Sequence, residues 1–458
     1  MKYLRFIMIF FLAGLLSQVA SAQGLLGGLL SNITQTLSNT VGSLLGQPQN
    51  VIVRTNLGLA GLQNVCLINS CTVVRSLDGG NQLYLVQPAQ GLIPDLLATV
   101  LRVVDGILDA EPDQLLVIPP STSNKPYQTG VPSTLWDQTP VNYFGATVWD
   151  GYVNQPASMI IRVNQAQNAF NVSGSGIVAD IDTGVDPNHP ALKGVLLLGY
   201  DFTRNQPGGS EMTDVGTMAP SSCSACQAAF VNQHTAAMLD QHTAAMLDGS
   251  PYAAFGHGTE VVGVIHLVAP TAHIMPLKAF HPDGTGDLSD ILRAIYYAVQ
   301  NHVNVINMSF DLTSSSQELA DAINYASSNN VICVASSGND GKQEIVYPAG
   351  LKNVMGVAST NDFDQRSSFS NYGNQVVWVA APGENIVTTY PFGTYAATSG
   401  TSFSSPMVAG TAALILNLVP KANQAKAAAA ISHAHWIGSN MGNGRLDVFR
   451  ALSSVDPD

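Results

Sequence analysis

The sequence predicts an α/β protein built on a doubly wound, mostly parallel sheet with helices on both faces. From about residue 168, short apolar runs typical of buried strands alternate with longer segments of helical periodicity. Parallel strands need crossover connections, usually helices, so this alternation favours a parallel sheet covered on both faces. The strand candidates are Ile177–Ile181, His273–Lys278, Val303–Met308, Val331–Ala335 and Val354–Ala358, and the helix candidates are Leu288–Gln300, Gln317–Ser328 and Ser405–Val419.

Length and composition fit more than one folded unit. The 458 residues exceed a typical single domain, and a hydrophobic content of 46% supplies a large core. Charged residues make up only 11%, and the net charge is −13. Because phosphate binding needs clustered Lys and Arg, this balance argues against a nucleic-acid partner.

The N-terminus has the pattern of an export signal. Lys2 and Arg5 precede the apolar run Phe6–Leu16, and Ala20-Ser21-Ala22 forms a small-residue cleavage site. The alternative is a membrane anchor, but the apolar run is shorter than the ~20 residues that span a bilayer. We therefore expect residues 1–22 to be removed and the product to be secreted, extracellular or periplasmic, without a membrane partner.

Five cysteines leave one unpaired if the others form disulfides. Cys66 and Cys71 flank a short apolar stretch, where a disulfide would staple a hairpin. Cys223 and Cys226 form a C-x-x-C, which favours a local loop disulfide over a metal or redox site because no second C-x-x-C is present. Cys333 lies in an apolar run and is expected to be a small buried hydrophobe.

The residues before the main α/β pattern divide into three segments. Residues 23–50 have almost no charge and are expected to form a linker. Residues 51–118 predict a small α+β domain, with strands at Val51–Arg54 and Leu83–Gln87, an amphipathic helix at Pro94–Asp105 and an acidic strand at Ile107–Asp113. Residues 119–167 are rich in Pro, Ser, Thr and Asn and are expected to connect this domain to the main one.

A perfect tandem repeat lies inside the main domain, predicted at 168–452. The segment Gln233–Asp240 recurs unchanged at Gln241–Asp248. Its paired His234 and His242 suggest a metal site, but no cysteine accompanies them. A duplication within a tolerant surface loop is the simpler interpretation. The repeat belongs to an insertion at 204–252 that precedes a histidine motif.

Three motifs supply the groups of a nucleophilic serine site. D-T-G at Asp182–Gly184, G-H-G-T at Gly256–Thr259 and G-T-S-F-S-S-P at Gly400–Pro406 provide a carboxylate, an imidazole and a hydroxyl. Chymotrypsin-like chains carry these groups in the order His, Asp, Ser and α/β-hydrolases in the order Ser, Asp, His, whereas the subtilisin fold has Asp, His, Ser. The chain resembles the subtilisin-like (subtilase) serine peptidases over about 168–452, ending in G-N-G-R-L-D at Gly442–Asp447.

The resemblance assigns the three members of a catalytic triad. Asp182 follows a predicted parallel strand and would accept the Nδ1–H of the histidine, although the family usually has an aliphatic residue where Asp180 stands. His257 would be the general base that takes the serine proton and returns it to the leaving amine. Ser402, at a loop-to-helix junction with Pro406 in the first helical turn, would be the nucleophile.

The resemblance also assigns an oxyanion donor and a substrate cleft. Asn339, in A-S-S-G-N-D-G after a predicted strand, would donate its side-chain amide to the oxyanion. Asp311 replaces a usual glycine and would narrow the cleft or disfavour acidic residues, and Val346 would make the pocket floor shallow and apolar. The expected substrate-binding residues are Ser309, Phe310, Asp311, Ser336, Ser337, Gly338 and Val346.

The same resemblance extends to the N-terminal domain and to cofactors. Residues 51–118 resemble the inhibitory propeptide of subtilases, which would make the chain's own propeptide an intramolecular inhibitor; the alternative is an independent binding module. The loop that carries the strong calcium site in many subtilisins is missing after His266, and no D-x-D-x-D-G loop occurs elsewhere. No catalytic metal is therefore expected, and a structural calcium stays open.

Taken together, these features predict a secreted serine endopeptidase that hydrolyses peptide or protein substrates through an acyl-enzyme. The alternative is a catalytically silent subtilase scaffold that binds peptides, which the complete set of Asp182, His257 and Ser402 disfavours.

Overall fold

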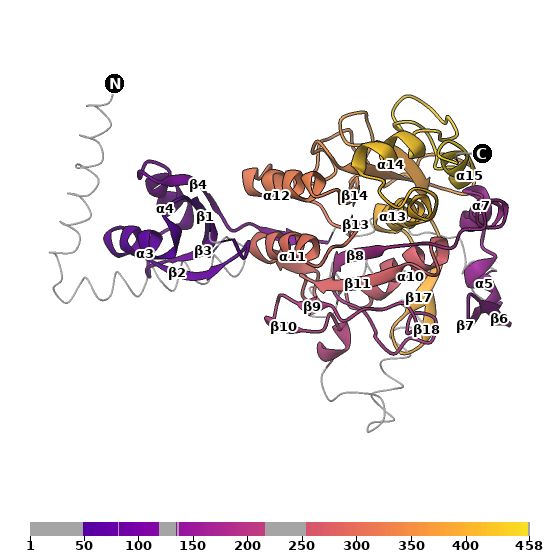
Figure 1. Ribbon diagram of the computed structural model, residues 1–458, viewed down its shortest axis with the longest axis horizontal. Coiled ribbons are helices and arrows are strands. Elements are labelled where there is room, and N and C mark those ends of the chain that lie inside the picture. The colour runs from indigo at the N-terminus through magenta and orange to yellow at the C-terminus, as the bar shows by residue number, and fades with distance from the viewer. Residues whose placement is uncertain (1–48, 81, 119–133, 135–136, 216–252, 457–458) are drawn as a thin grey trace. The chain divides into compact units, whose positions relative to one another are not determined.

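Figure 1 shows the computed structural model of the chain, which describes residues 49–80, 82–118, 134, 137–215 and 253–456. These residues form two compact units, one ending at Leu115 and the other beginning at Leu116. Several predictions lie outside the described residues: the signal at 1–22, most of the linker at 23–50, the pair Cys223 and Cys226, and the repeat with His234 and His242.

The first unit is a four-stranded antiparallel sheet with two helices. One buried cluster joins one face of the sheet to the helix positions Leu62, Cys66, Leu97 and Leu101, so the two helices and the sheet share a core. Its elements are β1 (Val51–Thr55), α3 (Gly58–Asn69), β2 (Cys71–Ser76), β3 (Leu83–Pro88), α4 (Pro94–Leu101) and β4 (Ile107–Pro112), and the strand order is β2-β3-β1-β4.

Two local expectations for this unit need correction. The disulfide between Cys66 and Cys71 joins the end of α3 to the start of β2, so it does not staple a hairpin. The amphipathic pattern predicted a helix as far as Asp105, but α4 ends at Leu101, and Gly106 adopts a positive φ of 88° in the turn that leads into β4.

The second unit contains the predicted doubly wound sheet. Its eight strands have the order β10-β9-β11-β8-β13-β14-β15-β16, and all neighbours are parallel except the short edge pair β10 and β9. The strands are β8 (Ile177–Asp182), β9 (Tyr200–Asp201), β10 (Gln206–Pro207), β11 (His273–Lys278), β13 (Val305–Met308), β14 (Ile332–Ser336), β15 (Met355–Thr360) and β16 (Val379–Pro382).

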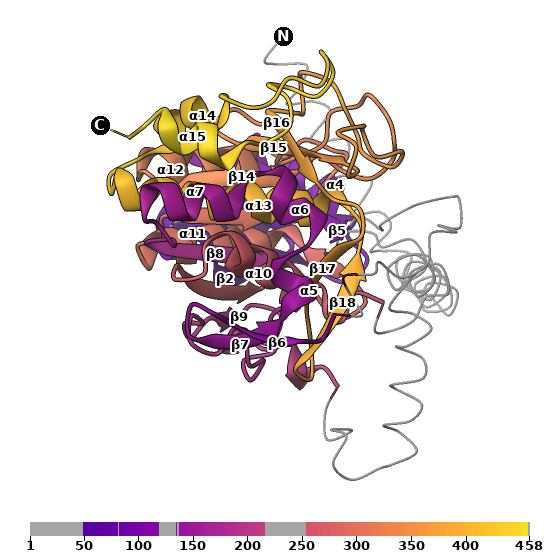
Figure 2. The same ribbon diagram turned by 90° about the vertical axis from the view of Figure 1, so that its right-hand side faces the viewer.

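Helices cover both faces of this sheet (Figures 1 and 2). On one face, α11 (Leu288–Gln300) packs against α12 (Gln317–Ser328), and both contact the strands. On the other face, α10 (His257–Val268) packs along α13 (Thr401–Leu418), which crosses β13 to β16. Every residue of α10 is buried, as expected for a central helix. The C-terminal helices α14 (Gln424–Ile431) and α15 (Val448–Ser453) contact α13.

Smaller elements complete the unit. Residues 137–170 showed no regular pattern in the sequence, but they form a hairpin and three short helices. Tyr143 and Tyr152 anchor them, since their hydroxyls each donate to a carbonyl of α10 at 2.6 Å, those of Leu267 and Gly263. The elements are β6 (Pro140–Tyr143), β7 (Ala146–Trp149), α5 (Asp150–Val153), α6 (Pro156–Ile160), α7 (Val163–Phe170), the hairpin β17 (Ile386–Tyr390) and β18 (Thr394–Thr398), and the pair β12 (Thr285–Asp287) and β5 (Leu115–Val117).

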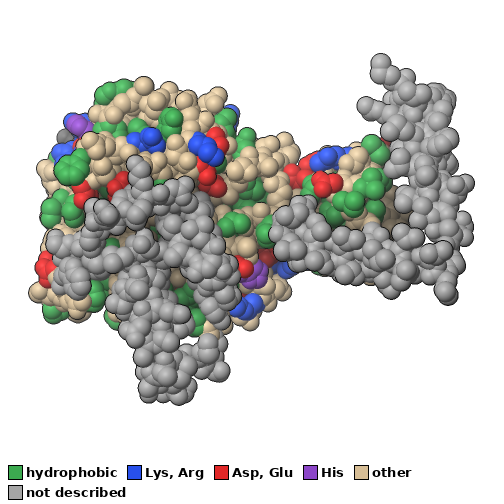
Figure 3. All heavy atoms as spheres, turned by 180° about the vertical axis from the view of Figure 1, so that it is seen from behind, with side chains coloured by type: hydrophobic (Ala, Val, Ile, Leu, Met, Phe, Trp, Pro, Cys, Tyr) green, Lys and Arg blue, Asp and Glu red, His purple; other side chains and the backbone are tan. Residues whose placement is uncertain are grey.

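The surface of the described residues carries few charges. On the face in Figure 3, Lys and Arg side chains stand singly or in small groups among polar and apolar ones. Among the residues that the structure describes, no helix is both long enough and apolar enough to cross a membrane.

The carboxyl ends of three neighbouring strands bring the predicted site residues to one edge of the sheet. Asp182 ends β8, Ser309 follows β13, and Asn339 comes three residues after β14. Open α/β sheets bind their ligands at this edge, which is therefore where the site is sought.

Candidate active site

Asp182 and His257 form a buried pair. Asp182 ends β8, and His257 is the first residue of α10, directly after Gly256, whose φ of +98° turns the chain into the helix. With its proton on Nδ1, the imidazole donates to the Asp182 carboxylate, at 2.7 Å from Oδ1 and 2.9 Å from Oδ2. Both side chains are almost fully buried. The carboxylate thereby fixes the orientation of the ring and leaves Nε2 to act as a base.

The Asp182 carboxylate also sets the basicity of the imidazole. Burial alone would lower the pKa of His257, because it penalises the charged ring. The negative charge and hydrogen bond of Asp182, helped by Glu260, outweigh burial and raise the pKa of His257 above its usual 6.5. An imidazolium formed during a reaction is therefore stabilised in place.

Ser402 lies in the first turn of α13. Its Oγ donates to the carbonyl oxygen of Ser309 at 3.3 Å, and the ring of the next residue, Phe403, lies 5.6 Å from the His257 ring. The hydroxyl and the imidazole thus come from two packed helices, α13 and α10, that meet at their N-terminal ends. The N-terminus of α13 adds backbone N–H groups that favour negative charge beside Ser402.

The start of α13 differs from the sequence prediction. The helix begins at Thr401, so Ser402 is inside it, and Pro406 lies beyond the first turn. Proline has no N–H and cannot bond the carbonyl four residues earlier, which is that of Ser402. Ser309 replaces this donor, since its Oγ donates to the Ser402 carbonyl at 3.0 Å. A serine that follows β13 therefore holds the backbone of the predicted nucleophile.

Asn339 is fixed against the same helix. Its side-chain Oδ1 accepts hydrogen bonds from the backbone N–H of Thr401 at 2.9 Å and from the Thr401 hydroxyl at 2.8 Å. Because these contacts define which end of the amide is the oxygen, Nδ2 is the donor end. Asn339 is buried, and these hydrogen bonds hold it to the residue directly before Ser402.

The predicted substrate-binding residues come together in three segments. Ser309 and Phe310 directly follow β13, whereas Ser336 is the last residue of β14 and Ser337 comes after it. The third segment contains Val346, and the next residue, Tyr347, pairs with Leu312 through two backbone hydrogen bonds of 2.7 and 2.9 Å. Five of the seven predicted residues are almost fully buried in these segments: Ser309, Phe310, Ser336, Ser337 and Val346. Asp311 lies against Gly338, since a Cβ on Gly338 would lie 2.6 Å from Asp311 Oδ2.

A buried polar network behind the Asp182–His257 pair was not predicted. Glu211, in the short 3₁₀ helix η2 (Glu211–Thr213), accepts hydrogen bonds from the Gly256 N–H at 2.7 Å, from the Thr259 hydroxyl and from the Thr183 hydroxyl at 3.3 Å. Burial raises the pKa of Glu211 to about 8, although the hydrogen bonds from Thr259 and Gly256 oppose this. One carboxyl group thus ties Thr183, the residue after Asp182, to Gly256, directly before His257, and to Thr259, two residues after it.

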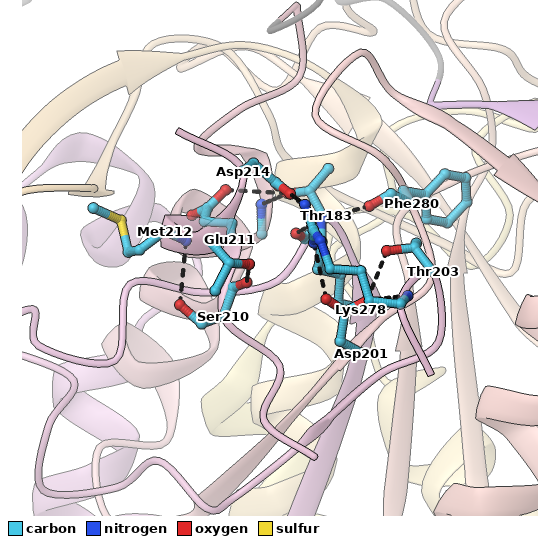
Figure 4. Close-up of polar contacts among 12 residues, drawn as sticks. Thr183, Asp201, Thr203, Ser210, Glu211, Met212, Asp214, Lys278 and Phe280 are labelled. Carbon is cyan, nitrogen blue, oxygen red and sulfur yellow. Dashed lines mark hydrogen bonds and ion pairs between the residues drawn. The ribbon is translucent and has the colours of Figure 1, made fainter. Parts of the chain in front are cut away.

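Figure 4 shows how Lys278 supports this network. Lys278 is fully buried at the end of β11, opposite Asp182 in the strand register. Its Nζ donates to the carbonyls of Thr183 and Phe280 at 2.7 Å each, and to the Asp214 carboxylate at 2.8 Å. The only feature of the sequence that could have indicated this role is the position of Lys278 as the last residue of a mostly apolar strand.

Asp180, the second carboxyl of β8, has partners of its own. Its Oδ1 accepts a hydrogen bond from Asn307 Nδ2 at 2.9 Å, and Asn307 Oδ1 accepts from the Ser405 hydroxyl at 2.8 Å. Burial, with the neighbouring charge of Asp182 adding to it, raises the pKa of Asp180 well above its usual range. Asp180 is therefore linked to α13 through Asn307, whereas Asp182 holds the imidazole.

Within the described residues, no three or more His, Cys, Asp or Glu side chains are arranged to hold a metal ion.

Comparison with known proteins identifies the family of the chain. Residues 174–449 match the subtilase family. Thermitase from Thermoactinomyces vulgaris is 33% identical over 292 residues, which cover 63% of this chain and 93% of thermitase. Subtilisin BL from Lederbergia lenta is 41% identical over 169 residues, which cover 35% of this chain and 62% of that protein.

A solved structure supports the fold. The crystal structure of a lanthipeptide protease superposes with a TM-score of 0.52 at 23% identity, covering 66% of this chain and 95% of that one. The family match spans more than half of the chain, and thermitase is covered almost from end to end. This chain therefore belongs to the subtilase family and is a serine endopeptidase.

Proposed function

We propose that the protein cleaves peptide bonds through Asp182, His257 and Ser402 with an acyl-enzyme intermediate. The observation that carries this proposal is the Asp182–His257 pair at the N-terminal end of α10, packed against the helix that holds Ser402. Ser402 Oγ attacks the scissile carbonyl while His257 takes its proton, and His257 then returns that proton to the leaving amine.

The oxyanion is held by two kinds of donor in this proposal. Asn339 presents Nδ2, and the backbone N–H of Ser402 lies at the positive end of α13. Water then attacks the acyl-enzyme, with His257 again as the base, and Ser402 is released. Asp182 keeps the ring in one tautomer throughout.

A fluorophosphonate probe tests this assignment on secreted, processed protein. We expect labelling of Ser402, and phenylmethylsulfonyl fluoride should block peptide hydrolysis. Ser402→Ala should lose both labelling and turnover. Labelling of another serine, or hydrolysis that persists in folded Ser402→Ala, would contradict the proposed nucleophile. Missing turnover in the processed wild type would instead favour the silent-scaffold alternative.

We further propose that the protein is exported and made as a precursor with an inhibitory N-terminal unit. The support lies at the start of the second unit. Val117 forms an antiparallel bridge with Asp311, and the Ile118 N–H donates to the Gly284 carbonyl at 2.9 Å. Residues 116–118 thus lie as an added strand beside the predicted substrate segment, as an extended substrate would. Segment 1–22 would direct export.

Processing distinguishes this proposal from an independent N-terminal module. Secreted Ser402→Ala should accumulate as an unprocessed chain that begins near Gln23, because the first cut is made by Ser402 itself. The wild type should yield a mature enzyme of roughly 300 residues. A separately added 23–118 fragment should inhibit the mature enzyme. Normal processing of Ser402→Ala in a protease-deficient host would exclude self-maturation, and a folded fragment without inhibitory effect would favour a separate module.

A further inference from the structure

Asp311 carries a carboxylate oxygen that lacks a protein partner. Its Oδ2 has almost no exposed surface and no hydrogen-bond partner within the described part of the chain. Enclosed polar atoms of native proteins are usually paired, and an ionised carboxylate costs more than a neutral group when it is not. An enclosed, unpaired carboxylate oxygen therefore indicates a ligand that supplies the missing donor.

The surroundings of Asp311 call for a positive charge. Burial raises the pKa of Asp311 to about 7, and the negative charges of Asp340 and Glu344 add to this effect. Lys342 lies in the same loop, but among the described ion pairs none joins it to these carboxylates. A cation placed here would interact favourably with three carboxyl groups at once.

The position of the carboxylate defines which substrate side chain can reach it. Oδ2 lies against Gly338, the residue before Asn339, and Asp311 is two residues after Ser309, whose carbonyl accepts the Ser402 hydroxyl. The carboxylate therefore borders the space directly beside the proposed nucleophile and oxyanion donor.

Strand geometry leads to the same place. Val117 and Asp311 form a directly opposed antiparallel pair. Along a substrate strand in this register, the residue two positions further on lies opposite Ser309. It is the residue nearest Ser402, so it supplies the carbonyl that the serine attacks.

We propose that the pocket beside Ser402 selects a lysine or arginine at the substrate residue that precedes the cleaved bond, with Asp311 as the specificity-determining group. This inference rests on the proposed peptidase function. The charged end of the basic side chain pairs with Asp311 Oδ2. The proposed pocket is thus acidic at this wall.

Matched peptide substrates test the selection. Four-residue p-nitroanilides that differ only in the last residue, lysine or norleucine, have nearly the same length and shape and differ in charge. With EDTA present, so that no metal cation occupies the carboxylates, the wild type should have a kcat/KM at least about tenfold higher for lysine than for norleucine. Asp311→Asn and Asp311→Gly should bring this ratio close to one.

The exposed Asp362 provides the control, because Asp362→Asn changes the net charge equally at a site outside the pocket wall. It should keep the lysine preference. A wild-type enzyme that cleaves the norleucine substrate without preferring lysine, or an Asp311→Asn variant with the wild-type ratio, would overturn the inference and leave the peptidase function intact. Failure of processed wild type to cleave any substrate or react with the fluorophosphonate would overturn the proposed function, and this inference with it.

Discussion

The carboxylates of Asp180 and Asp182 lie two residues apart on β8, and they hold different helices. Asp182 binds the imidazole of His257, which begins α10, whereas Asp180 binds Asn307 and, through it, Ser405 of α13. Two carboxyl groups on one strand face thus serve separate purposes, and substitution should separate them.

Asp182→Asn should lower kcat by about 10⁴-fold, because an amide favours the wrong imidazole tautomer. Asp180→Asn should have a much smaller effect, since burial already favours the uncharged form of Asp180 and an amide oxygen can still accept from Asn307. Both are measured as kcat on variants whose circular dichroism matches the wild type. Equal losses would mean that the structure does not discriminate the two carboxyl groups as proposed.

The pH dependence of hydrolysis should report the His257–Asp182 pair. His257 acts as a base only when neutral, and its pKa is raised above 6.5, so kcat/KM should fall as the pH drops and reach half its maximum above pH 6.5. Removing the carboxylate in Asp182→Asn should shift this midpoint downward. A neutral substrate keeps Asp311 out of the measurement. A midpoint that is the same in both proteins would assign the titration to another group.

Asn339→Ala should lower kcat with little change in KM, because in the proposed mechanism the amide contacts the oxyanion and not the ground-state carbonyl. Removal of one such donor in subtilisin costs about 10²–10³ in kcat. Asn339→Asp is the matched variant: it keeps the acceptor for Thr401 but replaces the donor with a negative charge, so it should be at least as slow. A KM effect without a kcat effect would instead assign Asn339 to substrate binding.

Glu211 should matter for stability in a pH-dependent way. Its native pKa of about 8 lies above its usual 4.5, so the folded state holds a proton that the unfolded state releases between these values. The contribution of Glu211 to stability is therefore greatest below about pH 4.5 and decreases as the pH rises toward 8. Glu211→Gln, which cannot titrate, should remove this decrease.

Urea unfolding measures the free energy of unfolding with glutamate or glutamine at position 211, at pH 5 and at pH 8. A Ser402→Ala background avoids autolysis. Glu211→Ala serves as the second variant, because it leaves the buried Gly256 N–H without its acceptor and should cost about 1–3 kcal/mol at either pH. Parallel pH curves for glutamate and glutamine at this position would contradict the raised pKa.

The preference for lysine should itself depend on pH. Asp311, facing Asp340 and Glu344 with Lys342 in the same loop, has a pKa raised to about 7. Its charge is lost below this value, so the lysine-to-norleucine ratio of kcat/KM should increase from pH 6 to pH 8. The contribution of His257 cancels in the ratio. In Asp311→Asn the ratio should be flat over this range.

Sequence reasoning succeeded where local pattern decides the structure. The bounds expected for β11, α11 and α12 agree with the structure, because β11 is a short, mostly apolar run and the two helices have a clear period of 3.6. It missed α3, whose segment Gly58–Asn69 contains two glycines and lacks an amphipathic pattern. It also placed the start of α13 too late, because small polar residues such as Thr401, Ser402 and Ser404 are typical of caps and loops.

The parts of the site that escaped prediction depend on distant pairs. Glu211 and Gly256 are 45 residues apart, and Asp180 and Asn307 are 127 apart. Neither pair belongs to a continuous motif, so only the folded chain shows that a carboxyl group in one segment satisfies a donor in the other. The residues of the proposed triad could be predicted because each forms a short motif with the glycines next to it in the sequence.

The strand at residues 116–118 carries information about substrates that bind in its place. Leu116 and Ile118 are 2% and 1% exposed, whereas Val117 between them is 41% exposed. A peptide in the same position would present every second residue to the enzyme and the others to water. Sequence logos from cleaved libraries should therefore show alternating constraint: aliphatic residues at the positions of Leu116 and Ile118, and near-random composition at the position between them.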